Sequence, residues 1–328
     1  MGRLRIAGAT LAAVALLAVS CGGDDTPPAP TGSTGGGSSL AAAVASGDLS
    51  VGSPQRFELG IFQGGDQGTK LVTFGTIRMR FAFLGNGGGS PVPGPEATAT
   101  YVAAPGTATG SGPPTLSDPN DARGVYEADQ VLFDRPGAWQ VEASASIQGL
   151  GDQTLQAVFP VRPDPALPAP GDHALKTENL TMASTDAPPE AIDSRALDGA
   201  PVPDPELHRW TIAKAIAEHR PALVIFATPT YCQSRFCGPT VDGIEQLAKE
   251  YPTKAVYIHV EIWRHYNSDL SKAVINQAAA DWLYRNGDLT EPWLYLIGAD
   301  GIIKDRWGPL FDLDQVGQEL AALPDMKG

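Results

Sequence analysis

Residues 225–240 read IFATPTYCQSRFCGPT, an apolar run followed by two cysteines five positions apart. The run begins upstream as PALVIF at 221–226, a short continuous apolar segment of the kind buried in a central strand. Downstream, VDGIEQLAKEY at 241–251 repeats apolar residues with helical spacing. The sequence therefore predicts a buried strand, a loop that carries Cys232, and a helix close to Cys237.

The amino terminus indicates export. Residues 1–20 place Arg3 and Arg5 before an apolar stretch that is shorter than the ~20 residues of a membrane-spanning helix. The tetrapeptide AVSC at 18–21 resembles the lipobox of bacterial lipoproteins, which implies that Cys21 is acylated after cleavage. An ordinary signal peptide with a cysteine nearby is the alternative. Disulfides persist outside the cytoplasm, so Cys232 and Cys237 are expected to form a dedicated pair.

The charge of the chain excludes one class of partner. The chain has 23 Lys and Arg against 37 Asp and Glu, and cleavage after residue 20 would remove two arginines, which gives a formal charge of −16. Such a chain lacks the cations that neutralise phosphates, so we expect no nucleic-acid partner.

The first half of the chain is expected to be β-structure. Residues 22–47 are rich in Gly, Ser, Pro and Thr and are predicted to be a flexible tether. From 55 to 160, apolar residues alternate in short runs separated by Gly and Pro, which indicates an antiparallel β-sandwich. The segment YEADQVLFDRPGAWQVEAS at 126–144 resembles bacterial immunoglobulin-like domains.

The second half is expected to alternate helices and strands. After a proline-rich linker, the predicted helices and strands imply a mixed sheet covered by helices on both faces. The predicted helical segments are LHRWTIAKAIAEHR, VDGIEQLAKEY, LSKAVINQAAADWLYRN and LDQVGQELAAL, and the predicted strands are PALVIF, KAVYIHVEIW, PWLYLIG and IIKDRW.

This order, with a cysteine directly after the first buried strand, resembles the thioredoxin superfamily over about 140 residues. In thioredoxins an alanine follows the second cysteine by eleven positions, and here that position is Ala248. The segment EPWLYLIGADGIIKDRWG at 291–308 resembles the strand that begins with a cis-proline. The resemblance implies that Pro292 is this proline, that Glu291 precedes it, and that Glu291, Pro292 and Trp293 line a substrate groove.

The resemblance also implies roles for the two cysteines. In this register Cys232 is the nucleophile, lying on a loop before the helix, and Cys237 resolves the mixed disulfide. A second register remains open, because CGPT at 237–240 copies the thioredoxin motif Cys-Gly-Pro-Cys with Thr240 in the last place, and there Cys237 attacks. The buried aspartate of thioredoxins is replaced by Ile225, and Asp242 is a candidate substitute. A carboxylate at Glu291 would raise the pKa of a nearby thiol.

Two other interpretations compete with redox exchange. A structural disulfide in a non-catalytic binding lipoprotein is one. A copper chaperone is the other, since thiolates suit Cu(I), with His259 or His265 as candidate ligands. His259 on a strand is more typical of a satisfied core histidine, and no ligand spacing connects His265 to the cysteines, so we predict no metal site and no cofactor.

The sequence thus predicts two domains, an all-β immunoglobulin-like sandwich followed by an α/β thioredoxin-like fold. The expected function is thiol–disulfide oxidoreductase activity on thiols and disulfides of exported proteins, by a lipoprotein anchored to the cell membrane. The expected segments are signal peptide 1–20, tether 21–47, sandwich 48–162, linker 163–172 and thioredoxin-like domain 173–328.

Overall fold

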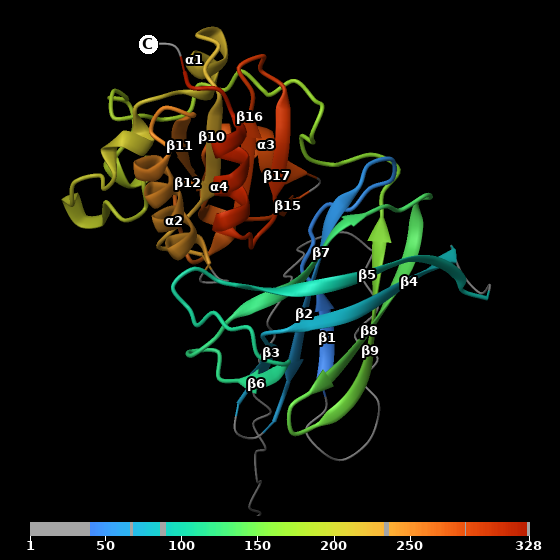
Figure 1. Ribbon diagram of the computed structural model, residues 1–328. Helices are drawn as coiled ribbons and strands as arrows, with labels where there is room; N and C mark the ends of the chain where they lie inside the picture. The colour runs from blue at the N-terminus through green and yellow to red at the C-terminus, as the bar shows by residue number, and fades with distance from the viewer. Residues whose placement is uncertain (1–39, 66–67, 86–89, 233–235, 286, 327–328) are drawn as a thin grey trace, which may run out of the picture.

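The computed structural model describes residues 40–65, 68–85, 90–232, 236–285 and 287–326 (Figure 1). The signal peptide, most of the tether and the lipidation residue Cys21 lie outside the described residues, so these interpretations stay predictions. None of the helices in the described ranges combines the length and the apolar character that a membrane crossing requires.

The first half of the described chain forms one antiparallel sheet around its own core. Hydrogen bonds connect its strands in the order β6-β3-β2-β7-β5-β4-β8-β9, with β1 paired to β2. The inward faces of these strands carry large apolar residues, because alternation places every second side chain on one side of a strand. The strands are β1 (Leu40–Val44), β2 (Gln55–Gln63), β3 (Lys70–Thr73), β4 (Thr76–Gly85), β5 (Val92–Ala103), β6 (Thr115–Ser117), β7 (Gly124–Val131), β8 (Gly137–Ile147) and β9 (Gly151–Val161).

Aromatic rings fill the centre of this first core. Phe57, Phe81, Phe133 and Phe159 pack against one another with centroids 4.8–6.4 Å apart, mostly edge to face. The indole N–H of Trp139 is buried beside them and donates to the carbonyl of Arg135 at 3.0 Å. The first half therefore has an apolar core of its own.

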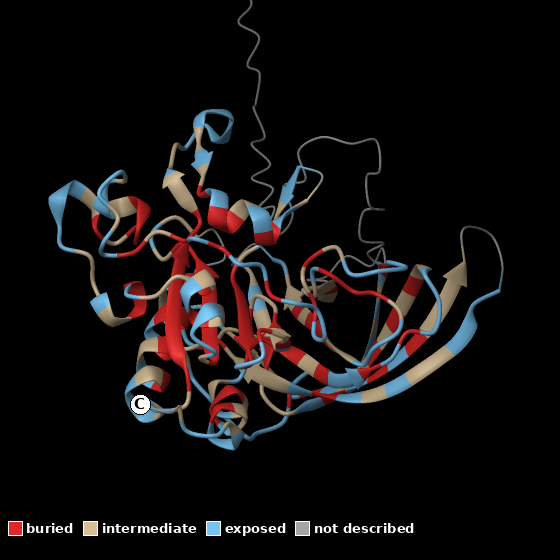
Figure 2. Ribbon diagram, turned by 90° about the horizontal axis from the view of Figure 1, so that it is seen from above, coloured by how far each residue is buried: buried red, intermediate tan, exposed pale blue. Residues whose placement is uncertain are grey.

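The second half is built on a four-stranded mixed sheet in the order β11-β10-β16-β17. β10 (Ala222–Ala227) pairs in parallel with β11 (Val256–Glu261) and antiparallel with β16 (Trp293–Ile297), and β17 (Ile303–Trp307) completes the sheet. Every residue of β10, β11 and β16 is buried, as Figure 2 shows. Both faces of the sheet are covered, so these strands are buried along their whole length and mostly apolar, with His259 and Glu261 on β11 as the buried polar residues.

Four short α-helices cover the sheet in the described part of the chain. One face packs against α1 (Ile212–Ala217) and α3 (Gln277–Leu283), and the other packs against α2 (Cys237–Glu250) and α4 (Leu313–Ala322). The remaining elements are the 3-10 helices η1 (Pro189–Ala191), η2 (Leu197–Gly199), η3 (Pro205–His208) and η4 (Leu270–Lys272) and the small strands β12 (Trp263–His265), β13 (Val274–Ile275), β14 (Tyr284–Arg285) and β15 (Asp288–Leu289).

The fold class predicted from the sequence is wrong. The described residues are mostly β, with 39% in strands and 18% in helices and with several antiparallel sheets, and no large α/β thioredoxin-like domain is evident among them. In the first half, hydrogen bonds join the strands into one continuous path in place of two separate layers. In the second half, the helices are too few and too short, because proline-rich and irregular chain occupies most of residues 163–211.

One predicted helix is also wrong in detail. The segment LSKAVINQAAADWLYRN divides into η4, β13, the seven-residue α3 and β14. The amide of Asn276 stops a longer helix, because its Nδ2 donates to the carbonyls of Ala191 and Glu261 at 2.9 and 2.8 Å. Tertiary hydrogen bonds therefore override the helix propensity of this segment.

The two halves are held together by partly buried ionic contacts. Arg306 on β17 donates from Nη1 to Asp48 Oδ2 at 2.9 Å, and Arg56 on β2 forms a bidentate pair with Asp305 at 2.9 and 2.7 Å. The segment predicted to be a linker also packs on the second sheet, where Asp172 accepts from the N–H of Ile303 at 3.0 Å. The predicted domain boundaries stay predictions.

Candidate functional site

Cys232 and Cys237 form a disulfide at the end of the central strand β10, with their Cα atoms 6.0 Å apart. Cys237 is the first residue of α2 and is fully buried, whereas Cys232 lies on the preceding loop and is partly exposed. An incoming thiolate therefore reaches the sulfur of Cys232 first. The sulfur of Cys237 lies where the unpaired N–H groups of the helix favour a negative charge.

The loop that carries Cys232 is anchored to neighbouring segments. The N–H of Cys232 donates to the carbonyl of Thr228 at 3.1 Å. The N–H of Thr230 donates to Ser194 Oγ at 3.1 Å, and Thr228 Oγ1 lies 3.4 Å from the same oxygen. These contacts fix the position of Cys232 relative to β10, as exchange at a defined sulfur requires.

Glu291 and Pro292 approach the disulfide from the start of β16. The Glu291–Pro292 peptide bond is cis, which confirms the isomer predicted for Pro292. One carboxylate oxygen of Glu291 and the sulfurs of Cys232 and Cys237 lie within 4.8 Å of one another. The chain thus brings three of the predicted site residues, with Pro292 adjacent, to one point.

The environment of Glu291 holds its side chain in the neutral form. Oε2 is enclosed and has no hydrogen-bond partner among the described residues. Burial, and then the nearby charge of Glu261, raise the pKa of Glu291 to about 8. Near neutral pH this side chain is therefore mostly a carboxylic acid beside the sulfurs. It can supply a proton there, which a simple carboxylate could not.

The other sequence candidates lie elsewhere. Trp293 is buried, and its Nε1 donates to Thr290 Oγ1 at 2.9 Å. Asp242 contacts Arg195 Nη1 at 3.4 Å on the surface of α2. His265 is exposed at the end of β12. His259 is fully buried and faces Asp193, so neither histidine belongs to the cysteine group.

A small cleft of about 140 Å³ lies next to Cys232 along the chain. Tyr231 and Tyr266 stack in it with ring centroids 3.8 Å apart and planes 9° from parallel. Trp263 closes one side, and the remaining lining residues are Glu190, Leu197, Arg264 and His265. Neither Tyr231 nor Tyr266 was predicted from the sequence, although the position of Tyr231 beside Cys232 is a signal that could have indicated it.

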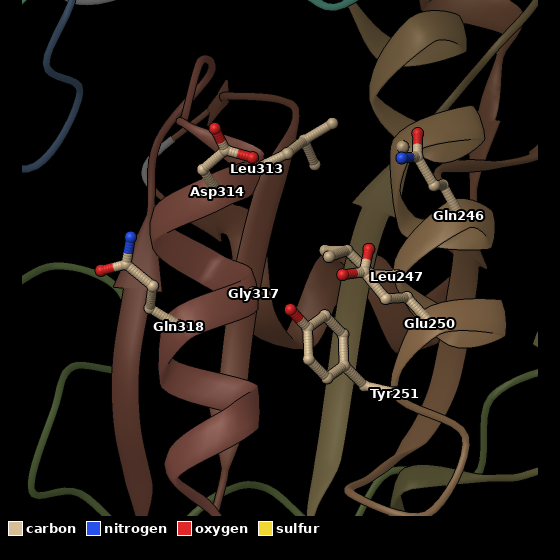
Figure 3. Close-up of a pocket in the computed structure, with 9 residues that line it drawn as sticks. Gln246, Leu247, Glu250, Tyr251, Leu313, Asp314, Gly317 and Gln318 are labelled. Carbon is tan, nitrogen blue, oxygen red and sulfur yellow. The ribbon is translucent and has the colours of Figure 1, made fainter.

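A second cavity, of about 270 Å³, lies between α2 and α4 (Figure 3). Gln246, Glu250 and Tyr251 line it from the side of α2, and Asp314 and Gln318 line it from α4. None of its lining residues belongs to the disulfide group. We therefore assign the candidate site to the disulfide and the tyrosine cleft rather than to this larger cavity.

The sequence analysis also missed a buried group of ionisable side chains, Asp193, His208 and His259. Asp193 lies in irregular chain and His208 in the short 3-10 helix η3, and no periodic pattern in the sequence marks either residue. Comparison with protein-family models, curated proteins and solved structures gave no match for this chain.

Proposed function

We propose that this protein exchanges disulfides with thiols of exported proteins through the pair Cys232 and Cys237. The observation that carries the proposal is an acid placed beside a half-accessible disulfide, with one carboxylate oxygen of Glu291 within 4.8 Å of both sulfurs. A disulfide that only closes a loop needs no such neighbour. Two further features support exchange: the exposure of Cys232 and the adjacent aromatic cleft.

The first step joins the substrate to Cys232. A substrate thiolate attacks the sulfur of Cys232, the S–S bond to Cys237 breaks, and the bonding pair moves to the sulfur of Cys237. The carboxylic acid of Glu291 gives its proton to this sulfur, so Cys237 becomes a thiol and the negative charge passes to the Glu291 carboxylate. The product is a mixed disulfide between the substrate and Cys232.

The second step releases the substrate. A second thiolate of the substrate attacks the substrate sulfur of the mixed disulfide, and Cys232 leaves as a thiolate. Two substrate thiols have then become a disulfide, and the pair Cys232 and Cys237 has taken up the two electrons. The reverse direction uses the same groups, with Glu291 accepting the proton of Cys237 as that thiol attacks.

The proposal extends to the location of the protein. Arg3, Arg5 and the AVSC motif support a lipid anchor at Cys21, which would keep the site outside the cytoplasm, where disulfides persist. The cis-peptide segment at Pro292 would receive an extended stretch of the substrate chain.

Trapping with Cys237→Ser tests the proposal. This variant retains the accessible Cys232, so it should accumulate mixed disulfides with a disulfide-bonded peptide, and Cys232→Ser should accumulate none. A glutathione redox titration of the full chain should give a midpoint within about −120 to −270 mV, the range of exported and cytosolic oxidoreductases. A midpoint below about −300 mV together with no trapping would identify a structural disulfide in a binding protein and overturn the proposal.

A further inference from the structure

Two fully buried imidazoles converge on one oxygen atom of a fully buried carboxylate. Asp193 follows η1, His208 ends η3, and His259 lies on β11, all with no exposed surface. The ring nitrogens Nδ1 of His259 and Nε2 of His208 lie 3.2 and 3.4 Å from Asp193 Oδ2. The group therefore offers two imidazoles and one carboxylate at a single point.

The hydrogen bonds of His259 define which nitrogen carries its proton. Nε2 lies 3.1 Å from the carbonyl oxygen of Ala227, which can only accept, so Nε2 carries the proton. In the neutral imidazole, Nδ1 then directs a lone pair toward Asp193 Oδ2, which is also an acceptor. Two acceptors at this distance need a proton or a cation between them.

Hydrogen-bond geometry favours the cation. Nδ1 of His259 and both ring nitrogens of His208 make no hydrogen bond of acceptable geometry with the described residues, despite their short distances to Asp193. A protonated imidazole would instead align its N–H with the carboxylate. Buried polar groups rarely remain unsatisfied, and an ion bound to Asp193 Oδ2 would give a partner to two of these three nitrogens, Nδ1 of His259 and Nε2 of His208.

The spacing fits a tetrahedral transition-metal ion. Ligands about 2.0–2.1 Å from such an ion lie about 3.3 Å from one another, and the two measured contacts to Asp193 Oδ2 bracket that value. Imidazole and carboxylate ligands suit Zn²⁺ and related divalent ions. The Nε2–H of His259 on a backbone carbonyl is also the usual orienting contact of a ligating histidine.

The surrounding charges are compatible with a cation. Arg195 donates to Asp193 from Nε at 3.0 Å and from Nη2 at 2.7 Å, and Nη2 also donates to Asp204 at 2.8 Å, which balances its charge. The buried Glu261 adds a negative charge near His259. A ligating carboxylate that is itself hydrogen-bonded in this way is typical of metal sites.

We propose that Asp193, His208 and His259 bind one divalent first-row transition-metal ion, for which Zn²⁺ is the probe. The ion joins η1 and η3 to β11. Ser194, next to Asp193, holds the loop of Cys232 through the N–H of Thr230. The proposal does not depend on disulfide exchange, because none of its ligands touches the cysteine pair.

Metal titration of the full chain tests the site with the disulfide intact, so that the thiolates of Cys232 and Cys237 cannot contribute. Chelator-treated protein should bind one Zn²⁺ per chain in calorimetry, and its midpoint of thermal unfolding should rise with added Zn²⁺. The affinity should fall at least about 100-fold in His208→Gln or His259→Gln, because losing a ligand costs more than losing an orienting partner. His265→Gln, an exposed histidine, is the matched control and should bind as the unchanged chain does.

The absorption spectrum of bound Co²⁺ is recorded on the unchanged chain, so it tests the site even if a variant fails to fold. The unchanged chain should give the strong visible bands of a four- or five-coordinate site with nitrogen and oxygen ligands and without a sulfur charge-transfer band. A weak octahedral spectrum would indicate surface carboxylates and overturn the proposal. So would less than one ion per unchanged chain, or a folded His208→Gln variant that binds as tightly as the unchanged chain.

Discussion

Glu291 places a carboxylate oxygen within 4.8 Å of the sulfur of Cys237, although Glu291 lies just before β16 and Cys237 is the first residue of α2. Burial raises the pKa of this side chain to about 8, so a proton is available next to the sulfur that leaves when the disulfide opens. The cis-peptide segment therefore contributes chemistry to the site in addition to shape.

Glu291→Gln should change how stability depends on pH. Glu291 ionises in the unfolded chain near pH 4.5, but in the folded chain only near pH 8. Between these values only the unfolded chain releases the proton, so Glu291 lowers the free energy of unfolding by at most about 1.4 kcal/mol per pH unit. The neutral glutamine lacks this effect. The difference in free energy of unfolding between Glu291→Gln and the unchanged chain should therefore increase in favour of the variant from about pH 5 to pH 8 and stay constant above pH 8.

Denaturant unfolding at pH 5, 7 and 9 measures this difference. Glu178→Gln replaces an exposed glutamate and should follow the unchanged chain at all three pH values. Parallel curves for Glu291→Gln and the unchanged chain would show that Glu291 is ionised in the folded protein at neutral pH, and its role as a proton donor would be lost.

Reduction of the disulfide should lower stability only modestly. The bond between Cys232 and Cys237 closes a loop of six residues, for which the chain-entropy model gives about 2 kcal/mol. Denaturant unfolding of the oxidised and reduced chain should differ by this amount, while a variant with both cysteines replaced by serine should be indifferent to the reductant. If reduction alone unfolds the second half, the bond is a structural staple and the exchange proposal fails.

Arg306→Ala should weaken the contact between the two halves. The guanidinium donates to Asp48 Oδ2 at 2.9 Å and to the carbonyls of Leu167 and Pro168 at 3.2 and 3.0 Å. Because the Asp48 side chain is only 2% exposed, removing Arg306 leaves a buried charge without its main partner, at a cost of about 3 kcal/mol.

The matched control for Arg306 is Arg78→Ala, which removes an exposed pair with Glu96 and should cost less than about 1 kcal/mol. Limited proteolysis should also cut residues 163–172 faster in Arg306→Ala than in Arg78→Ala. Equal losses of stability in the two variants would mean that the buried contact contributes no more than a surface pair.

The segment from β10 to α2 was predictable because its signals are local. A continuous apolar run marks β10, and helical periodicity marks α2, which spans Cys237–Glu250. The cis peptide bond before Pro292 was predicted from the resemblance of residues 291–308 to the thioredoxin strand that begins with a cis-proline. The short α3 was not predictable. The side chain of Asn276, just before α3, donates to the carbonyls of Ala191 and Glu261, and these contacts between segments distant in the sequence keep the helix from extending further back.

The chemistry of the site was predictable only in part. The sequence places Glu291 near the sulfurs, and we expected it to act as a negative charge that raises a thiol pKa. Burial reverses this expectation by raising the pKa of Glu291 itself, and burial of one carboxyl cannot be read from residue spacing. The sequence likewise indicated only a satisfied core histidine at His259. Its neighbours Asp193 and His208 come from segments without a periodic pattern, so their approach to His259 could not be predicted.

Tyr231→Ala should weaken the binding of peptide substrates more than the chemical step. Tyr231 and Tyr266 stack at 3.8 Å beside Cys232, and a peptide side chain that enters this cleft would pack on their rings. An aromatic contact is worth about 0.5–1.5 kcal/mol, so KM for a peptide disulfide should rise up to about tenfold. The rate with a small dithiol, which needs no cleft, should be unchanged. Tyr284→Ala removes an exposed tyrosine outside the cleft and should leave both rates unchanged. If Tyr231→Ala slows both substrates equally, the tyrosine only positions Cys232 and the cleft does not bind the substrate.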